Sequence, residues 1–177
     1  MKILDFPKLV FNKSYLAISI LGINYRLNIK YSNTHAVKLV KNINGIDIYI
    51  PKKNKDIDNS KIINLAIQKL YDDLAISELE ASLELARHIL GFAPEDYKIE
   101  RLKNNYYKCT KDKTLIINPE IIRFNHKIVD TTILQAFCKI KFKPNTNLYN
   151  ITLEKALKKY EAYIASYKNN YLNQEVC

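Results

Sequence analysis

The sequence predicts an α+β fold. Short candidate strands fill its first third, a long amphipathic helix follows, and further strands and two helices complete the chain. Strands and helices that are segregated along a chain, rather than alternating, are typical of α+β proteins. The length of 177 residues, with 47% hydrophobic and 26% charged residues, suits one globular domain. We therefore expect a single domain over residues 1–177, with a strand region at 1–58 and a helical region at 59–177.

Four antiparallel strands are expected in the N-terminal region. Residues 15–30 resemble two short strands around Gly22, because apolar and polar residues alternate there. Residues 37–40 and 46–50 are predicted to form a hairpin, with Asn44-Gly45 as a type I′ turn.

The long helix is predicted to begin at Asn59 or Ser60 and to end at Gly91. Apolar residues recur at helical spacing between these points, and a glycine is a common residue just after a helix. Residues 97–103 and 114–117 are expected to be extended, joined by a lysine-rich connection. Two further helices are expected, at about residues 127–140 and 153–167.

Charge alternates along the chain. Residues 1–69 carry a net charge of +8, residues 70–97 carry −6, and residues 98–143 carry +7. One interpretation is an acidic helix packed beside basic strands; the other is a basic face that binds nucleic acid. Lysine outnumbers arginine by 24 to 4 in a composition typical of an AT-rich genome, so net charge alone does not decide between them.

Basic and aromatic residues gather in the predicted extended segment 97–103 and in the connection that follows it. This combination suits contacts to phosphates and stacking on bases, so DNA or RNA is the expected partner. The candidate residues are Lys98, Arg101, Lys103, Tyr106, Tyr107, Lys108, Lys111 and Lys113.

Common catalytic patterns are absent from the sequence. It contains no glycine-rich phosphate loop and no Cys-x-x-Cys pair, and the spacing of Cys109, His126 and Cys138 fits no common zinc pattern. Three cysteines, an odd number, argue against a disulfide framework and for a cytoplasmic protein. No apolar run is long enough to cross a bilayer, so no membrane partner is expected.

Several ungapped segments carry a family resemblance. Residues 21–27 (LGINYRL) match an L-G-x-x-Y-x-L strand pair, residues 103–110 (KNNYYKCT) stand where W-G-S-C-S is expected, residues 115–118 (LIIN) match a strand end, and residues 128–134 (IVDTTIL) lead into a motif helix. On these segments the chain resembles the YgjP-like, SprT-related zinc metallopeptidases. The resemblance implies a zincin-like fold in which an H-E-x-x-H helix and a downstream histidine hold zinc.

The positions that the resemblance assigns to the metal site have changed. Gln135 and Lys139 stand at the first two ligand positions, Ala136 stands at the catalytic glutamate, and Asn145 stands at the third ligand. Amides are poor zinc donors, an ammonium repels the ion, and alanine cannot accept a proton from water. We therefore expect no zinc, no other cofactor and no peptidase activity. Gln135, Ala136 and Lys139 are expected on the cleft face of the helix, opposite Ile133, Phe137 and Ile140.

The sequence favours a catalytically inactive family member that acts as a binding module for nucleic acid. One alternative is a protein-interaction subunit that uses the tyrosine stripe Tyr160, Tyr163 and Tyr167 of the last helix. Another is a hydrolase with a repurposed site.

Overall fold

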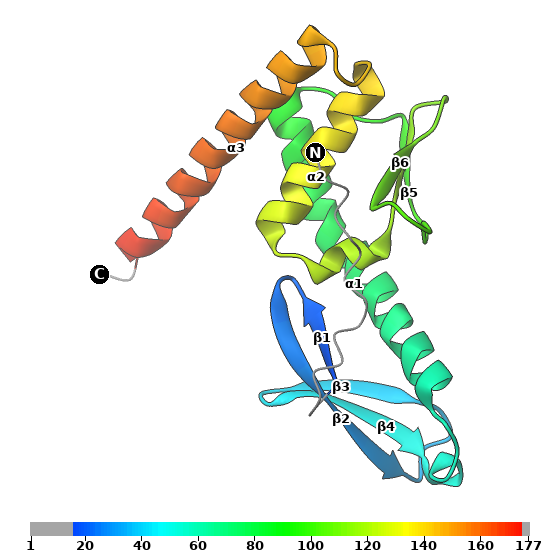
Figure 1. Cartoon of the computed structure of the whole chain (residues 1–177). Coiled ribbons are helices and arrows are strands. Elements are labelled where there is room, and N and C mark those ends of the chain that lie inside the picture. Colours follow the sequence, from blue (N-terminus) through cyan, green and yellow to red (C-terminus); the bar gives the residue numbers. More distant parts are fainter. Residues whose placement is uncertain (1–15, 175–177) are drawn as a thin grey trace.

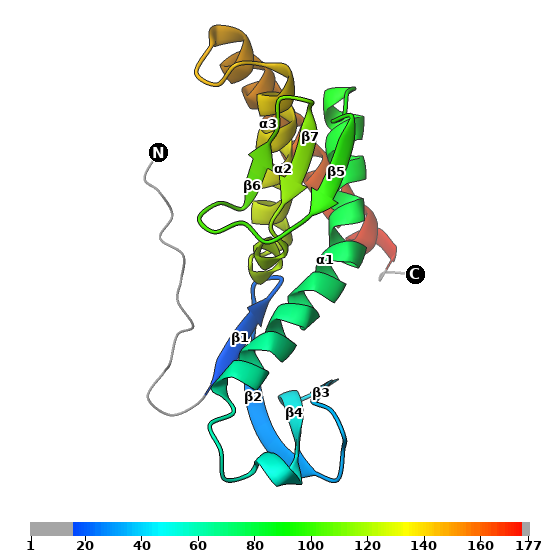
Figure 2. The same ribbon diagram turned by 90° about the vertical axis from the view of Figure 1, so that its right-hand side faces the viewer.

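The computed structural model describes residues 16–174, and the side chains of residues 16–166. One long helix, α1 (Ser60–Leu90), joins two groups of elements (Figure 1). A four-stranded sheet lies beside its N-terminal half, and a three-stranded sheet with two helices lies beside its C-terminal half (Figures 1 and 2).

The N-terminal sheet has the strand order β1-β2-β4-β3. Its strands are β1 (Ala17–Ile20), β2 (Ile23–Ser32), β3 (Lys38–Asn42) and β4 (Gly45–Pro51). The pairs β1–β2 and β3–β4 are antiparallel, as predicted, but β2 and β4 are parallel. The prediction of a wholly antiparallel sheet is therefore wrong. The β3–β4 hairpin places β4, not β3, beside β2, and β4 runs in the direction of β2.

Of the two hairpin turns, the β3–β4 turn has a different type from the one predicted. Leu21 and Gly22 both have positive φ, 49° and 80°, as a type I′ turn requires. The two-residue β3–β4 loop consists of Ile43 and Asn44, neither of which has a positive φ, so a type I′ turn at Asn44-Gly45 is wrong. Gly45 has a φ of 139°, and an added Cβ would lie 2.3 Å from the carbonyl oxygen of Arg26. A glycine is required there because β4 approaches β2 closely.

The boundaries of α1 agree with the prediction. Gly91 ends the helix with a φ of 71°, and its N–H donates to the carbonyl of Arg87. At the other end the side chain of Asn59 does not cap the helix, because its amide donates to the carbonyls of Asn54 and Ile57 in the preceding turn. That turn contains a short 3₁₀ helix, η1 (Lys52–Asn54).

The second sheet has the order β5-β7-β6, from β5 (Asp96–Ile99), β6 (Tyr107–Cys109) and β7 (Thr114–Ile117). β5 is parallel to β7, whereas β6 is antiparallel to it. The predicted lysine-rich connection thus contains an additional strand, β6. The chain continues through η2 (Pro119–Arg123), α2 (His126–Lys141) and α3 (Asn147–Gln174), which begins six residues earlier than expected.

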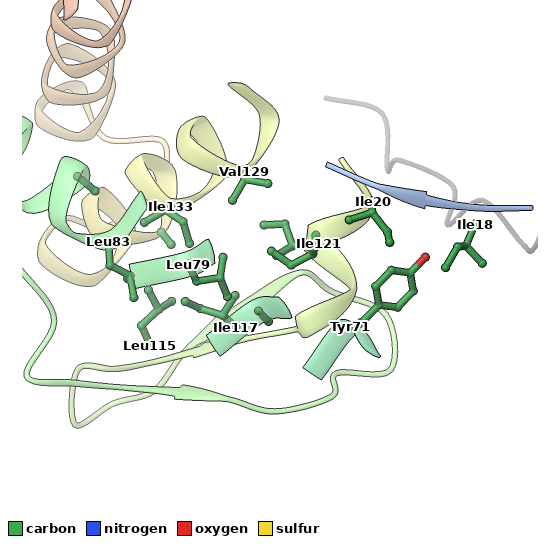
Figure 3. Packing of buried hydrophobic residues seen from close by; sticks show 14 of the residues in the cluster. Ile18, Ile20, Tyr71, Leu79, Leu83, Leu115, Ile117, Ile121, Val129 and Ile133 are labelled. Atoms are coloured by element: carbon green, nitrogen blue, oxygen red, sulfur yellow. The ribbon is translucent and has the colours of Figure 1, made fainter. Parts of the chain in front are cut away.

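A continuous hydrophobic core runs along α1 and reaches both sheets. Figure 3 shows its central part, where Leu79 and Leu83 of α1 lie close to Leu115 of β7 and Ile133 of α2. Toward the N-terminal sheet the core continues through Tyr71, whose hydroxyl donates to the Ser19 carbonyl at 3.0 Å. None of the helices in the described part of the chain is both long and apolar enough to cross a membrane.

Candidate functional site

The helix α2 carries three of the four positions that the resemblance assigns to a metal site. Asn125 caps it, because its side-chain oxygen accepts from the N–H of Ile128 at 3.0 Å. Ile133 and Phe137 face the core as expected, Gln135 is half-buried, and Lys139 is exposed. Ala136 is fully buried, so the helix face on which it was expected is covered at this position.

The strand β6 explains the burial of Ala136. It packs against α2 and places the Cys109 thiol 3.6 Å from the carbonyl oxygen of Ala136. Because side chains alternate along a strand, Tyr107 and Cys109 both point toward the helix while Lys108 points away. The ammonium of Lys139 lies 5.4 Å from the ring centroid of Tyr107, which is a cation–π contact.

The surroundings of Lys139 keep the phenols and thiols neutral. Burial, reinforced by Tyr149, Cys109 and Cys138, raises the pKa of Tyr107 to about 12. Burial likewise raises the pKa of Tyr149, and raises that of Cys138 to about 11. Burial also raises the pKa of Cys109, although Lys139 opposes the shift. These groups are therefore hydrogen-bond donors at neutral pH, not anionic ligands.

Asn145, the fourth position, lies in the turn between α2 and α3. It is exposed and has a φ of 65°, a conformation that asparagine tolerates better than most residues. The expectation that Asn145 lies close to Gln135 stays a prediction.

The eight candidate nucleic-acid residues are distributed over different parts of the second sheet. Leu115 and Ile117 of β7 are fully buried against the helices, so Ile116 faces the opposite side. Ile116 pairs with Lys98 of β5 and with Lys108 of β6, and these two lysines therefore flank it on the outer face. In Figure 2 this sheet lies in front of α2 and α1.

Two other lysines lie at opposite ends of the sheet. Lys103 belongs to the β5–β6 connection, and Lys111 belongs to the β6–β7 turn. Within the described part of the chain, no carboxylate lies within salt-bridge distance of Lys98, Lys103, Lys108 or Lys111.

The remaining basic candidates are paired with acids. Arg101 binds Asp72 of α1 at 2.7 Å and Glu120 of η2 at 3.6 Å, and it donates to the carbonyl of Gln68 at 2.6 Å. Lys113 lies 3.4 Å from Glu95. Arg101 in particular holds the β5–β6 connection against α1 and contributes little net positive charge.

The two tyrosines do not form an exposed stacking platform on this sheet. Tyr106 packs edge-to-face against Phe124, with the ring centroids 5.1 Å apart, and Tyr107 faces α2. The outer face of the sheet therefore offers lysines but no aromatic ring between them. In α3, Tyr160 is buried and Tyr163 is 43% exposed, whereas the side chain of Tyr167 lies outside the described residues.

A sequence model described as the YgjP-like metallopeptidase domain matches residues 7–134, which is most of the chain. The chain belongs to the YgjP-like family. No curated protein and no solved structure matches it. The predicted family is thus confirmed, together with an α+β, zincin-like fold. The YgjP-like match ends immediately before Gln135, the first of the altered positions.

Zinc, which a metallopeptidase family implies, does not fit the residues of this YgjP-like chain. Ala136 has no donor atom and is enclosed beneath Cys109, and Lys139 presents an ammonium where a ligand would be needed. Gln135 offers only an amide, which zinc rarely accepts. Among the described residues, no three His, Cys, Asp or Glu side chains come together in a way that could hold a metal ion.

Sequence reasoning missed two contributors to this site. β6 was not expected, because the alternation of Tyr107, Lys108 and Cys109 covers only three residues, too few to identify a strand. Tyr149, which raises the pKa of Tyr107, lies in the first turn of α3, a helix that was expected to begin later.

Proposed function

We propose that this YgjP-like protein lacks peptidase activity and binds nucleic acid through the outer face of sheet β5-β7-β6. The observation that carries the proposal is the row Lys98–Ile116–Lys108, in which two exposed lysines outside salt-bridge distance of the described carboxylates flank the half-buried Ile116. Asp112 lies close enough to respond to one of them: hydrogen bonds from Thr110 and Thr114 lower its pKa, and the charge of Lys98 adds to the shift. Lys103 and Lys111 extend the positive charge beyond both ends of the strands. Exposed lysines that form no salt bridge are suited to phosphate contacts, which supply most sequence-independent affinity.

The positions of the tyrosines define the mode of binding. Because Tyr106 packs on Phe124 and Tyr107 faces α2, neither ring is presented on the outer face to stack on a base. Contacts on this face are therefore to the phosphate backbone, and a duplex is as good a ligand as a single strand.

Fluorescence anisotropy with a labelled 20-bp duplex tests the binding surface. If four lysines each contact a phosphate, affinity should fall about 10²-fold between 50 and 200 mM salt. The double variant Lys98→Glu, Lys108→Glu should abolish binding at 50 mM salt. The control Lys61→Glu, Lys155→Glu makes the same change in net charge at exposed positions of α1 and α3. Equal loss in both variants, or no binding of DNA or RNA to the wild type, would overturn the proposal.

Metal analysis tests the loss of catalysis separately. Purified protein dialysed against zinc should retain no stoichiometric metal, because the altered positions supply no thiolate, imidazole or carboxylate. It should also cleave casein no faster with zinc than with a chelator. One bound equivalent of zinc, or chelator-sensitive cleavage, would show that the site has kept its chemistry.

A further inference from the structure

The outer face of the N-terminal sheet carries an aromatic ring between two lysines. Ile46, Ile48 and Ile50 of β4 are buried in the core, so the alternation of side chains puts Asp47 and Tyr49 on the other face. Tyr49 pairs with Lys30 of β2 on one side and with Lys38 of β3 on the other. Since neighbouring strands are about 4.8 Å apart, the two lysine backbones lie about 10 Å apart across the ring.

Among the residues that the structure describes on this face, the only acid is already bonded to its neighbours. Asp47 accepts from Lys30 at 2.6 Å and from Asn28 at 3.1 Å, and its side chain is only 8% exposed. The hydrogen bond from Lys30 lowers the pKa of Asp47, so the carboxylate is ionised and paired at neutral pH. The Lys30 ammonium lies over the ring of the half-buried Tyr49, 5.7 Å from the ring centroid, and half of the Lys30 side chain is exposed. A base that stacks on this face of the ring therefore takes the place of the Lys30 ammonium.

Positive charge surrounds Tyr49 with little opposition. Residues 24–58 contain seven lysines and arginines against three acids, Asp47, Asp56 and Asp58. Three of the lysines, Lys52, Lys53 and Lys55, are exposed in and just after η1, which follows directly on β4. They lie at the same end of the sheet as Tyr49, because β4 ends at Pro51, two residues after Tyr49, and η1 begins at the next residue.

This arrangement resembles the row Lys98–Ile116–Lys108 of the other sheet, with one decisive difference. Both rows place two lysines beside a central residue of the middle strand, but the central residue is Tyr49 here and Ile116 there. An aromatic ring on a sheet face stacks on unpaired bases of any identity, whereas an isoleucine does not. A duplex offers no unstacked base to such a ring.

We infer that the outer face of sheet β1-β2-β4-β3 is a second nucleic-acid surface, selective for single strands. A base stacks on Tyr49, while Lys38 and the lysines of η1 contact the flanking phosphates. The inference rests on the proposed function, because both assign nucleic acid as the ligand. The residues involved are different and lie on the other sheet.

A single tryptophan can report the stacking directly, because the natural chain contains none. In the variant Tyr49→Trp, titration with dT20 at 50 mM salt should quench the fluorescence to saturation, and a 20-bp duplex should not. The matched variant Ile76→Trp carries an exposed indole on the acidic part of α1, outside both lysine rows, and should show no quenching by base stacking. If dT20 binds by anisotropy without quenching Tyr49→Trp, the inference is wrong.

A second comparison separates this surface from the one proposed above. Tyr49→Leu keeps most of the side-chain volume and removes the ring, so dT20 affinity should fall about tenfold with duplex affinity unchanged. Lys98→Glu, Lys108→Glu should weaken the duplex and leave the quenching of Tyr49→Trp intact. Loss of dT20 binding in the lysine variant, with no effect of Tyr49→Leu, would overturn the inference and support the other surface. Intact duplex binding in the lysine variant, together with quenching of Tyr49→Trp by dT20, would support the inference and overturn the surface proposed above.

Discussion

Asp130 connects three helices through two hydrogen bonds. Its carboxylate accepts from the hydroxyl of Ser82 in α1 at 2.5 Å and from the hydroxyl of Tyr160 in α3 at 3.0 Å, while the aspartate itself belongs to α2. All three side chains are buried. A buried carboxylate is costly unless its oxygens are hydrogen-bonded, and here each oxygen has one hydroxyl donor. Burial and the charge of Asp130 raise the pKa of Tyr160, which keeps that hydroxyl protonated as a donor.

Tyr160→Phe should therefore lower the free energy of unfolding by about 2 kcal/mol, because a hydrogen bond to a charged group is lost inside the core. Urea denaturation followed by circular dichroism measures the change. Tyr97→Phe is the control, since Tyr97 is 46% exposed, and its effect should stay within about 0.5 kcal/mol. Equal stabilities of the Tyr160→Phe variant and the wild type would show that Asp130 does not hold α3.

Two glycines with positive φ should respond differently to alanine. Gly45→Ala places a methyl group 2.3 Å from the Arg26 carbonyl oxygen and should cost about 3 kcal/mol, from strain and overpacking together. Gly91→Ala meets no atom within 4 Å and should cost only about 1 kcal/mol, the penalty of its left-handed backbone. Thermal unfolding of the two variants provides the comparison. Equal losses would mean that contact with β2 is not what requires Gly45.

These residues also show what sequence reasoning can reach. The end of α1 at Gly91 was predicted correctly, because a helix end depends on nearby residues and the spacing of apolar residues indicates where it lies. Gly45 was assigned to a turn, whereas its role depends on contact with β2, which is remote in the sequence. The changed identities of Gln135, Ala136, Lys139 and Asn145 could be read directly, but the burial of Ala136 could not, since it depends on β6.

At the scale of elements, pairing between strands was the least predictable feature. β6 has only three residues, too few for a two-residue period to stand out, and its partner β7 defines it. The parallel pairing of β2 with β4 likewise depends on which strand of the hairpin lies inside the sheet. By contrast, α1 extends over 31 residues, and its apolar spacing identified it without any knowledge of its neighbours.

The helix α2 and the turn that follows it allow a gain-of-function test of the fold. Gln135→His and Lys139→His place two imidazoles one helical turn apart, and Asn145→His adds a third ligand if the zincin-like arrangement is retained. The triple variant should bind about one equivalent of zinc, measured by metal analysis after dialysis and by competition with a chromogenic chelator.

The double variant Gln135→His, Lys139→His is the matched control, because it lacks only the third ligand and should bind zinc far more weakly. Peptidase activity is not expected in either variant, since Ala136 supplies no base. If the double and triple variants bind zinc equally, Asn145 does not lie beside Gln135.

On the scale of the whole molecule, basic residues lie on both sheets, and most acidic residues of α1 lie beside the second sheet. The basic candidates lie on the two sheets, and the acidic part of α1 runs past the second one, where Asp72 pairs with Arg101. The first interpretation of the alternating charge, an acidic helix beside basic elements, therefore holds in part, and the second, a basic face that binds nucleic acid, stays a prediction. An acidic helix neutralises some basic residues, while Lys98, Lys108 and Lys38 lie on outer sheet faces and form no salt bridge within the described chain. The net charge summed along the sequence could not separate basic residues that pair with acids from basic residues that form no salt bridge.

The distribution of buried phenols and thiols makes the whole fold sensitive to alkali. Burial raises the pKa of Tyr71, Tyr106 and Tyr149, that of Tyr107 to about 12, and that of Cys138 to about 11. A group whose folded pKa exceeds its unfolded value stabilises the fold fully below the unfolded pKa, about 9 for a thiol and 10 for a phenol. That stability is lost as the pH rises through the folded values. The melting temperature should therefore stay level from pH 7 to about 8.5 and then fall progressively toward pH 11.

Tyrosinate absorbance at 295 nm gives an independent measurement of the same effect. In the native protein some of the 13 tyrosines should ionise only at a higher pH than in guanidinium, with the buried residues titrating last. Tyr107→Phe removes one of these groups, so its melting temperature should decline less steeply above pH 10 than that of the wild type. Superimposable titrations in native and denaturing buffer would contradict the prediction. They would show that water reaches the hydroxyls at the contact between β6 and α2, and that the enclosure of Ala136 and Tyr107 is not maintained in solution.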